Sequence, residues 1–279
     1  MRVFLFLASL LPLKPAKKII RGLMTVLPFQ MLDAYKVTFI NISISFPDLS
    51  TEEKTSLAKR SFIETVCSFY ETLYSLSRSP KNISQNILRV DNKYLMSQPL
   101  RAEGGLIISG IHNRSVDMLL QWINSQTPTV GIYKPIKNKM ADAHIKKHRE
   151  QLKNKVYSTS YRGVKELFKA INKNKVIMMA SDQVPQDGMG EYAKFFGRDA
   201  YTTTLITSLA NKTRKPLIYI GLFSASKNSL KITCHEAPDE MSVQSMNKTM
   251  QEMILNCPED YSWEYKRFKK PPENLDNPY

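Results

Sequence analysis

The sequence predicts an α/β fold with a mostly parallel central sheet flanked by helices. From residue 105 onward, short apolar runs alternate with longer segments in which apolar residues recur at helical spacing. Strand followed by helix, repeated along a chain, is typical of a parallel sheet. With 279 residues, 42% of them hydrophobic, the chain is long enough to bury the core of one domain.

The N-terminal segment, residues 1–40, is apolar and basic, and we expect it to be a helical membrane-associating segment. Residues 3–13 are apolar but number only eleven, whereas a bilayer-spanning helix needs roughly 20. A clear small-residue cleavage site is absent from the sequence, which favours a retained interfacial segment over a cleaved signal peptide. The alternative is an N-terminal helix packed onto the domain. The apolar residues are followed by the cations Lys14, Lys17, Lys18 and Arg21, and by a second, mostly apolar run over 23–32.

The remaining chain, residues 41–279, is expected to form the main domain. Ser50 with Glu53 three residues later predicts a capping box for a helix that runs toward Ser75. Further along, we predict strands over 105–109, 129–133, 175–180, 217–222 and 230–234, and helices over 116–125, 139–152, 162–172 and 202–213.

The formal charge of +15, from 40 Lys and Arg against 25 Asp and Glu, favours an anionic partner. A membrane surface, an acidic carrier protein and a phosphorylated lipid all fit. Nucleic acid is disfavoured because the basic residues do not form a recognisable binding motif with interleaved aromatics. The three cysteines are far apart, and neither they nor the four histidines show metal-ligand spacing. We therefore expect no metal, nucleotide or other cofactor.

The clearest chemical signal is the segment from Gly110 to Asp117. His112 falls in the turn between a predicted strand and a predicted helix, and Asp117 falls in the first helical turn. A carboxylate reaching back to the imidazole would fix its tautomer and leave the other nitrogen as a general base. The alternative is a capping carboxylate and an unrelated loop histidine. Asp182 follows the strand predicted over 175–180, so it is expected to share the crevice at the carboxyl ends of the strands.

Several ordered motifs resemble the bacterial lipid A biosynthesis acyltransferases, the lauroyl and myristoyl transferase family, over nearly the whole chain. The signature-like part is Ser181-Asp182-Gln183-Val-Pro185, followed by Phe195-Phe196-Gly197-Arg198 and Ala200-Tyr-Thr202-Thr203. Other segments resemble the family's His-x4-acid, Tyr-Arg-Pro…Asn and Trp…Arg-Phe-Lys motifs and its helix start. These are His112 to Asp117, Tyr133-Lys134-Pro135 with Asn138, Trp263 to Lys269, and Phe46 to Ser50.

The resemblance implies transfer of a fatty acyl chain from acyl carrier protein to a hydroxyl of a lipid A precursor, at the cytoplasmic face of the bacterial inner membrane. The acyl-acyl carrier protein is then the donor substrate, and no cofactor is required. His112 would be the general base and Asp117 its orienting partner. Arg149 falls where the family carries a functional arginine and is suited to bind a phosphate or polarise the thioester carbonyl. Asp182 would position Arg149 or the substrate.

Two departures from the family leave the acceptor open. Asp117 stands where many members have Glu, and the resulting His-x4-Asp is similar to that of the glycerol-phosphate acyltransferases, so the resemblance implies a glycerol-phosphate-acyltransferase-like α/β fold. Lys134 replaces the usual Arg. Another glycolipid or hydroxylated lipid is therefore an alternative acceptor, and a non-catalytic membrane- or nucleic-acid-binding protein is an alternative of a different class. A pair such as Phe195-Phe196 is more often part of the core; the alternative is a surface loop with Gly197 that contacts the acyl chain or the membrane, and these residues are not assigned to the site. A basic face for the carrier protein or for lipid phosphates is expected from Lys134, Lys137, Lys139, Lys146 and Lys147.

Overall fold

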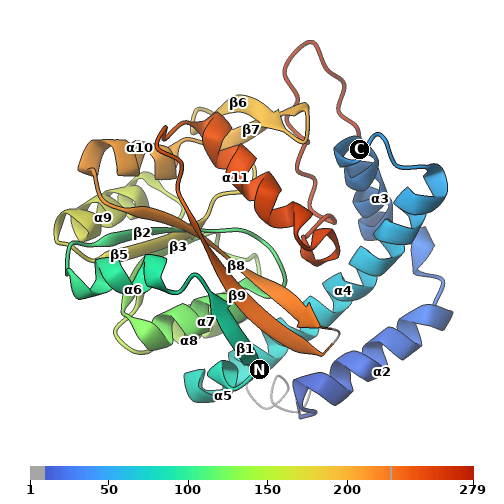
Figure 1. Ribbon diagram of the computed structural model, residues 1–279, viewed down its shortest axis with the longest axis horizontal. Helices are drawn as coiled ribbons and strands as arrows, with labels where there is room; N and C mark the ends of the chain where they lie inside the picture. Colours follow the sequence, from blue (N-terminus) through green and yellow to red (C-terminus); the bar gives the residue numbers. More distant parts are fainter. Residues whose placement is uncertain (1–9, 227) are drawn as a thin grey trace.

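The computed structural model describes residues 10–226 and 228–279, which form an α/β fold around a seven-stranded sheet (Figure 1). In space the strands follow the order β1-β9-β8-β2-β5-β3-β4, and of these neighbouring pairs only β8 with β9 is antiparallel. The predicted mostly parallel sheet is therefore confirmed. The strands are β1 (Ile87–Asp91), β2 (Leu106–Gly110), β3 (Thr129–Tyr133), β4 (Lys155–Ser158), β5 (Val176–Ala180), β8 (Leu217–Ser226) and β9 (Ser229–Glu236).

Helices cover both faces of this sheet, and a small hairpin lies beside it (Figure 1). The hairpin consists of β6 (Gly190–Phe195) and β7 (Arg198–Thr203), joined by Phe196 and Gly197, which both have positive φ as a two-residue hairpin turn requires. The helices are α2 (Leu13–Val26), α3 (Asp33–Ser45), α4 (Thr51–Ser77), α5 (Pro80–Ser84), α6 (Tyr94–Arg101), α7 (Val116–Gln126), α8 (Lys139–Arg149), α9 (Tyr161–Asn172), α10 (Leu205–Thr213) and α11 (Val243–Leu255), with short 3-10 turns η1 (Phe29–Met31) and η2 (Pro258–Asp260).

The hydrophobic core is split into two layers by the sheet. Successive residues of β2 point to opposite faces, so Leu106 and Ile108 join one cluster and Ile107 joins the other. The first cluster includes side chains of α5, α6 and α7, and the second includes side chains of α9, α10 and α11. Phe195 is fully buried in the second cluster, which confirms that it is part of the core.

The predicted strands and helices are present in the structure, but several begin or end at other residues than predicted. The capping box of α4 is present: Ser50 accepts from the Glu53 amide at 3.2 Å, and the Glu53 carboxylate accepts from the Ser50 amide at 2.8 Å. The helix predicted from residue 202 begins instead at Leu205, because Thr202 and Thr203 are strand residues paired with β6.

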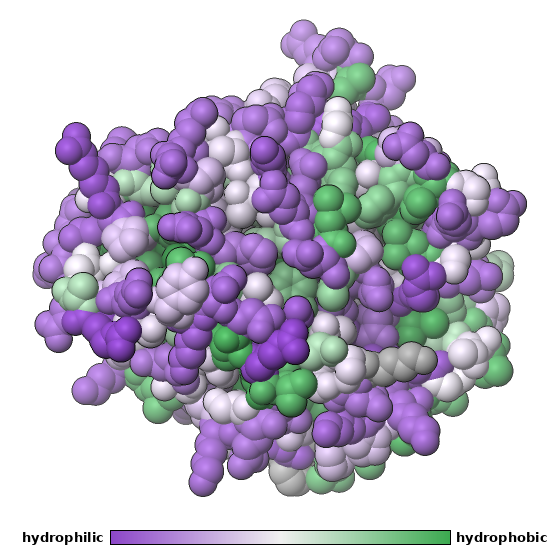
Figure 2. All heavy atoms as spheres, in the orientation of Figure 1, coloured by the Kyte–Doolittle hydropathy of each residue, from purple (hydrophilic) through white to green (hydrophobic). Residues whose placement is uncertain are grey.

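The N-terminal helix α2 packs one face on the domain and exposes the other. Leu13, Ala16 and Met24 are buried, whereas Ile19, Leu23 and Val26, spaced along the opposite face, are 50%, 56% and 78% exposed. Figure 2 shows apolar side chains at the surface on the right of the view, where α2, α3 and α4 lie in Figure 1. Residues 1–9 of the expected membrane-associating segment lie outside the described residues. Within the described ranges, no helix is both long and apolar enough to cross a bilayer.

Candidate active site

His112 and Asp182 lie at the same edge of the central sheet. His112 follows β2 by two residues, and Asp182 follows β5 by two. The two strands are parallel neighbours in register, with Gly110 opposite Ala180. Their carboxyl ends therefore bring both side chains to the edge where ligands bind in parallel α/β sheets.

Asp182 holds His112 by two hydrogen bonds. Its Oδ1 lies 2.6 Å from the imidazole Nδ1, and its Oδ2 accepts from the His112 backbone N–H at 3.0 Å. Burial and the charge of Asp182 raise the pKa of the Tyr261 hydroxyl. Asp182 is buried, whereas the His112 side chain is 25% exposed, and its Nε2 has no hydrogen-bond partner among the described residues. The ring is thus fixed at one nitrogen and accessible at the other.

The pKa values of this pair move apart. Burial alone lowers the pKa of an imidazole, but the charge of Asp182 and its hydrogen bond outweigh burial, so the pKa of His112 is raised. Burial alone raises the pKa of Asp182, and interaction with His112 more than offsets this, so the carboxyl pKa is lowered. Both shifts favour the imidazolium–carboxylate state, which is the state that forms when His112 accepts a proton.

A second carboxylate orients Arg149. The Arg149 guanidinium donates from Nε to Asp117 Oδ1 at 2.7 Å and from Nη2 to Asp117 Oδ2 at 3.0 Å, a bidentate arrangement. It also lies over the Tyr133 ring, 5.5 Å from its centroid. Burial disfavours the charged guanidinium, yet Asp117 outweighs it and raises the pKa of Arg149. The charge of Arg149 opposes protonation of His112, so the two pairs lie within electrostatic range of each other.

The predicted pairing of His112 with Asp117 is therefore wrong. The carboxylate on the imidazole is Asp182, and Asp117 holds Arg149, which is the reverse of the partners expected from the sequence. The physical reason lies in the local backbone. Ser115 caps α7 by accepting from the Met118 amide at 3.1 Å, which leaves Asp117 in the first turn, in contact with α8. His112 instead lies two residues after the end of β2, whose neighbour in the sheet is β5.

The sequence analysis missed Arg114, the middle residue of the same motif. Its backbone has φ of 52°, an uncommon conformation for a side-chain-bearing residue. Its guanidinium is fully buried and bonds Glu64 at 2.6 Å, Glu71 at 2.5 Å and Asp260 at 2.9 Å. Glu71 in turn pairs with the buried Lys17 of α2 at 2.8 Å. This buried network fastens the His112 loop to α4, to η2 and to the N-terminal helix.

The Tyr133-Lys134-Pro135 segment connects β3 to α8 and is held against that helix. The Tyr133 hydroxyl donates to Asp142 at 3.1 Å, and the Ile136 amide donates to the same carboxylate at 3.0 Å. Asn138 is the N-cap of α8 and accepts from two amides of its first turn. The predicted basic face is solvent-exposed at all five positions, Lys134, Lys137, Lys139, Lys146 and Lys147.

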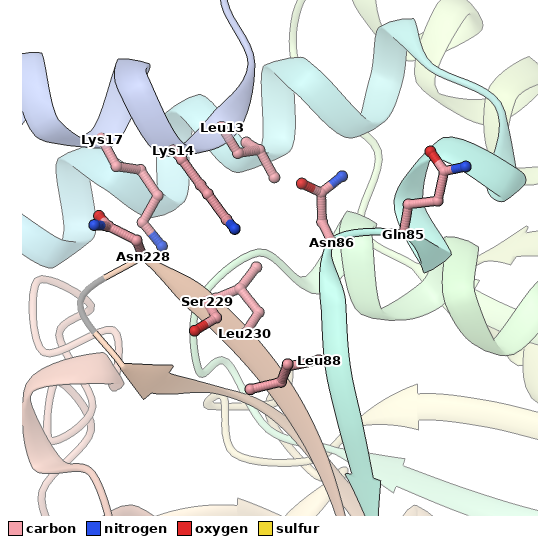
Figure 3. Close-up of a pocket in the computed structure, with 9 residues that line it drawn as sticks. All are labelled: Leu13, Lys14, Lys17, Gln85, Asn86, Leu88, Asn228, Ser229 and Leu230. Carbon is pink, nitrogen blue, oxygen red and sulfur yellow. The ribbon is translucent and has the colours of Figure 1, made fainter.

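A separate pocket of about 80 Å³ lies between α2, the α5–β1 connection and β9 (Figure 3). Lys14 and Lys17 of α2 and the amides of Asn86 and Asn228 lie around it. None of the described residues that line it belongs to the His112–Asp182 or Arg149–Asp117 pair. The pocket is therefore distinct from the candidate active site.

Chemically, this site combines a base with an accessible nitrogen and a neighbouring fixed guanidinium. Such a combination is suited to activating a hydroxyl and stabilising negative charge on a carbonyl or phosphate oxygen. This chain belongs to the bacterial lipid A biosynthesis acyltransferase family, whose profile matches residues 1–270.

Curated relatives agree with this assignment. The chain is 22% identical over 258 residues to the lipid A biosynthesis lauroyltransferase of Escherichia coli (strain K12), covering 88% of this chain and 82% of the relative. It is 20% identical over 243 residues to the lipid A biosynthesis palmitoleoyltransferase of the same strain, covering 83% and 78%. A lipid A biosynthesis acyltransferase of Shigella flexneri is similar to the same extent.

Proposed function

We propose that this protein transfers a fatty acyl chain from acyl carrier protein to a hydroxyl of a lipid A precursor. The observation that carries the proposal is the His112 imidazole, held at Nδ1 by buried Asp182 and left with an accessible Nε2 beside Arg149. Membership of the lipid A biosynthesis acyltransferase family supports the reaction class. Relatives that carry lauroyl and palmitoleoyl transferase names support a fatty acyl donor and a lipid A acceptor.

In the proposed reaction, Nε2 of His112 takes the proton of the acceptor hydroxyl as its oxygen attacks the thioester carbonyl. The new bond joins that oxygen to the acyl carbon, and the bond between carbon and sulfur breaks. Asp182 stabilises the imidazolium that forms in between. The imidazolium then returns its proton to the departing thiolate of the carrier, so no covalent enzyme intermediate is required.

Arg149 is the proposed electrostatic partner of this step. Its side chain is 19% exposed, and Asp117 fixes its orientation from the buried side. A fixed guanidinium offers donors to the oxyanion that develops on the thioester carbonyl or to a phosphate of the acceptor. Its cationic charge also keeps a fraction of His112 in the neutral, proton-accepting form.

The acidic carrier protein is proposed to dock on the basic face of the β3–α8 region. The five lysines are exposed there, together with two apolar side chains, Met140 at 69% and Ile136 at 44%. This region leads directly to Tyr133 and Arg149, so a donor docked on it would deliver its thioester to the site. Electrostatic complementarity of this kind steers association and fixes orientation.

The lipid acceptor is proposed to reach the site from the cytoplasmic face of the bacterial inner membrane. Exposed Ile19, Leu23 and Val26 of α2, with Leu27 and Met31 beyond it, form an apolar face flanked by lysines. Apolar residues next to cations are the composition of interfacial membrane-binding helices. This face, together with residues 1–9, is the proposed membrane-associating segment of 1–40, and residues 41–279 are the proposed acyltransferase domain.

Mass spectrometry of lipid products tests the proposal. Purified protein in phospholipid vesicles is incubated with lauroyl- or myristoyl-acyl carrier protein and a tetra-acylated, Kdo-bearing lipid A precursor, beside a His112→Ala variant. We expect a mass gain of one acyl chain, reduced about 10²- to 10⁴-fold in the variant, because a positioned general base contributes a factor of this size.

Two other outcomes would contradict parts of the proposal. Thioester hydrolysis without lipid acylation, lost in the His112→Ala variant, would keep the base and replace the acceptor by another hydroxylated lipid. Neither hydrolysis nor transfer in the wild type, with the protein shown to be folded, would exclude the enzyme in favour of a non-catalytic binding protein.

A further inference from the structure

Tyr133 is the last residue of β3, and the neighbouring strand fixes its backbone. It lies opposite Ser158 of β4, and its carbonyl accepts from the Thr159 amide at 3.0 Å. Tyr133 therefore stands at the carboxyl end of a parallel strand, the edge of the sheet at which ligands bind. Its side chain starts from a backbone that is held in place.

The hydroxyl of Tyr133 is bound to α8. It donates to Asp142 Oδ2 at 3.1 Å, while Oδ1 of the same carboxylate accepts from the Ile136 amide at 3.0 Å. Burial, and after it the hydrogen bond to Asp142, raises the pKa of the Tyr133 hydroxyl, so this group is a neutral donor and not a base at neutral pH. The ring is thus held at both ends, by β3 at its backbone and by Asp142 at its hydroxyl.

This fixed ring supports the guanidinium of Arg149, whose central carbon lies 5.5 Å from the ring centroid. A cation over the face of a Tyr ring at this distance is attracted by the electrons of the ring. Asp117 holds the guanidinium along one edge only, through Nε and Nη2. Two bonds along one edge leave the group free to tilt about that edge, and contact with the Tyr133 ring opposes this tilt.

The remaining donors of Arg149 are not used by the protein. Nη1 has no hydrogen-bond partner among the residues that the structure describes, and Nη2 uses one of its two N–H groups. The side chain of Arg149 is 19% exposed. Nη1 and the outer N–H of Nη2 are therefore the donors that remain for a bound substrate.

We propose that Tyr133 is a positioning residue whose ring aims the free donors of Arg149 at the oxygen of the reacting thioester carbonyl. This inference rests on the proposed acyl transfer, in which that oxygen becomes negative in the transition state. Two parts of one side chain have separate roles: the face of the ring orients the guanidinium, and the hydroxyl bound to Asp142 orients the ring. Tyr133 acts through Arg149 and takes no part in proton transfer.

Solution NMR of the Arg149 Nε–H group tests the positioning without any substrate. The full-length protein is labelled with nitrogen-15 in its arginines, and the Arg149 signal is assigned by its loss in Arg149→Lys. The heteronuclear NOE of this signal reports motion of the group on the picosecond to nanosecond timescale. We expect a lower NOE in Tyr133→Leu, because the guanidinium has lost the ring that opposes its tilt. Tyr133→Phe keeps the ring and should keep the NOE close to the wild-type value.

Phe168→Leu is the matched control. Phe168 of α9 is, like Tyr133, a partly buried ring beside a cation, with Lys212 Nζ 5.7 Å from its centroid. It belongs to neither pair of the candidate active site. We expect this variant to leave both the Arg149 NOE and acyl transfer unchanged. Circular dichroism checks that each variant is folded; if Tyr133→Leu is not, Tyr133→Met takes its place, because the longer methionine side chain fills more of the space.

The kinetic arm uses the transfer assay with the same variants. We expect Tyr133→Leu to lower kcat about 5- to 30-fold, the factor that corresponds to a partly desolvated cation–π contact. The KM values for acyl-acyl carrier protein and for the acceptor lipid should not change, because an interaction realised only in the transition state affects kcat alone. Tyr133→Phe should stay within about 3-fold of the wild type, since it retains the ring.

The possible results separate this inference from the proposed function. An Arg149 NOE that is the same in the wild type and in Tyr133→Leu overturns the role of Tyr133, whatever the activity. A lower NOE in a protein that transfers no acyl chain supports the positioning of Arg149 and overturns the proposed function. A raised KM for the acceptor lipid at constant kcat overturns the inference, because the ring then contributes to binding of the substrate and not to the transition state. An equal loss of kcat in Tyr133→Phe and Tyr133→Leu also overturns it, because the effect then comes from the hydroxyl.

Discussion

Asp182 contacts His112 twice, at the imidazole Nδ1 and at the backbone amide. The bond to Nδ1 sets the tautomer of the ring and stabilises its charged form. The bond to the backbone amide fixes the loop that carries the ring. Asp182 is itself buried, so solvent water does not compete for its carboxylate. Asp117 binds Arg149 instead of His112. We therefore expect substitutions of Asp182 and of Asp117 to have different effects.

Replacing Asp182 by Asn should reduce acyl transfer on the order of 10²-fold or more and change its pH dependence. The pKa of His112 is raised mainly by Asp182 against the effect of burial, so loss of this carboxylate lowers it. The base must be neutral to accept a proton, so activity increases as pH rises through the His112 pKa, and the acidic limb should move to lower pH. The pH profile of kcat/KM measures this; an acidic limb that stays in place would contradict the assignment of Asp182.

Replacing Asp117 by Asn should leave the acidic limb in place but weaken the orientation of Arg149. One of the two charge-assisted bonds to the guanidinium is lost. We expect a decrease in kcat of about 10- to 100-fold, because a misplaced donor stabilises the transition state poorly. Measuring both variants in parallel is decisive, since the opposite pattern, with the pH shift in Asp117→Asn, would restore the pairing suggested by sequence spacing.

Replacing Arg114 by Met should strongly destabilise the protein. The substitution leaves Glu71 and Asp260 buried without their main cation, and breaking a buried ion pair in this way costs about 3–5 kcal/mol. Urea denaturation measures the change in free energy of unfolding. The matched control is Arg89→Met, which removes an exposed pair with Asp91 and should cost no more than about 1 kcal/mol. Equal losses in the two variants would contradict a central role for the network.

Replacing both Lys137 and Lys139 by Ala should raise the KM for acyl-acyl carrier protein several-fold at low salt, with little change in kcat. Screening shortens electrostatic range to about 10 Å at 0.1 M salt, so the difference should shrink as salt increases. The control pair, Lys173 and Lys175, is also exposed but precedes β5, at the opposite edge of the sheet. If the control pair changes the KM equally, the docking face lies elsewhere or the effect is one of net charge.

Much of the fold could be predicted because its signals are local. The alternation of apolar runs with helical periodicity predicted five of the central strands and the helices between them, and the Ser50–Glu53 pattern predicted the start of α4. Strands β1, β4, β6 and β7 were not predicted. Each contains at least one charged residue and lacks the continuous apolar run that marks the predicted strands, so their pairing comes from neighbouring strands and not from their own composition.

The candidate site was predicted as a set of residues but not as a set of contacts. Position after a strand was enough to bring His112 and Asp182 to one edge of the sheet, and similarity of motifs suggested Asp117 and Arg149. No sequence signal marked Arg114 beyond its presence inside the His112 to Asp117 motif. The partners of Arg114 lie 43, 50 and 146 residues away in the chain, a separation that spacing rules do not reach.

The sequence by itself therefore determined the α/β class, the edge of the sheet that carries the site, and the residue types gathered there. The tertiary structure alone decided which carboxylate holds which basic group. The positions of the strands and helices along the chain are set by the hydrophobic pattern, which can be read from the sequence. Side-chain partners depend instead on a few backbone angles, such as the positive φ of Arg114 and the capped first turn of α7, and on how separate segments pack against each other.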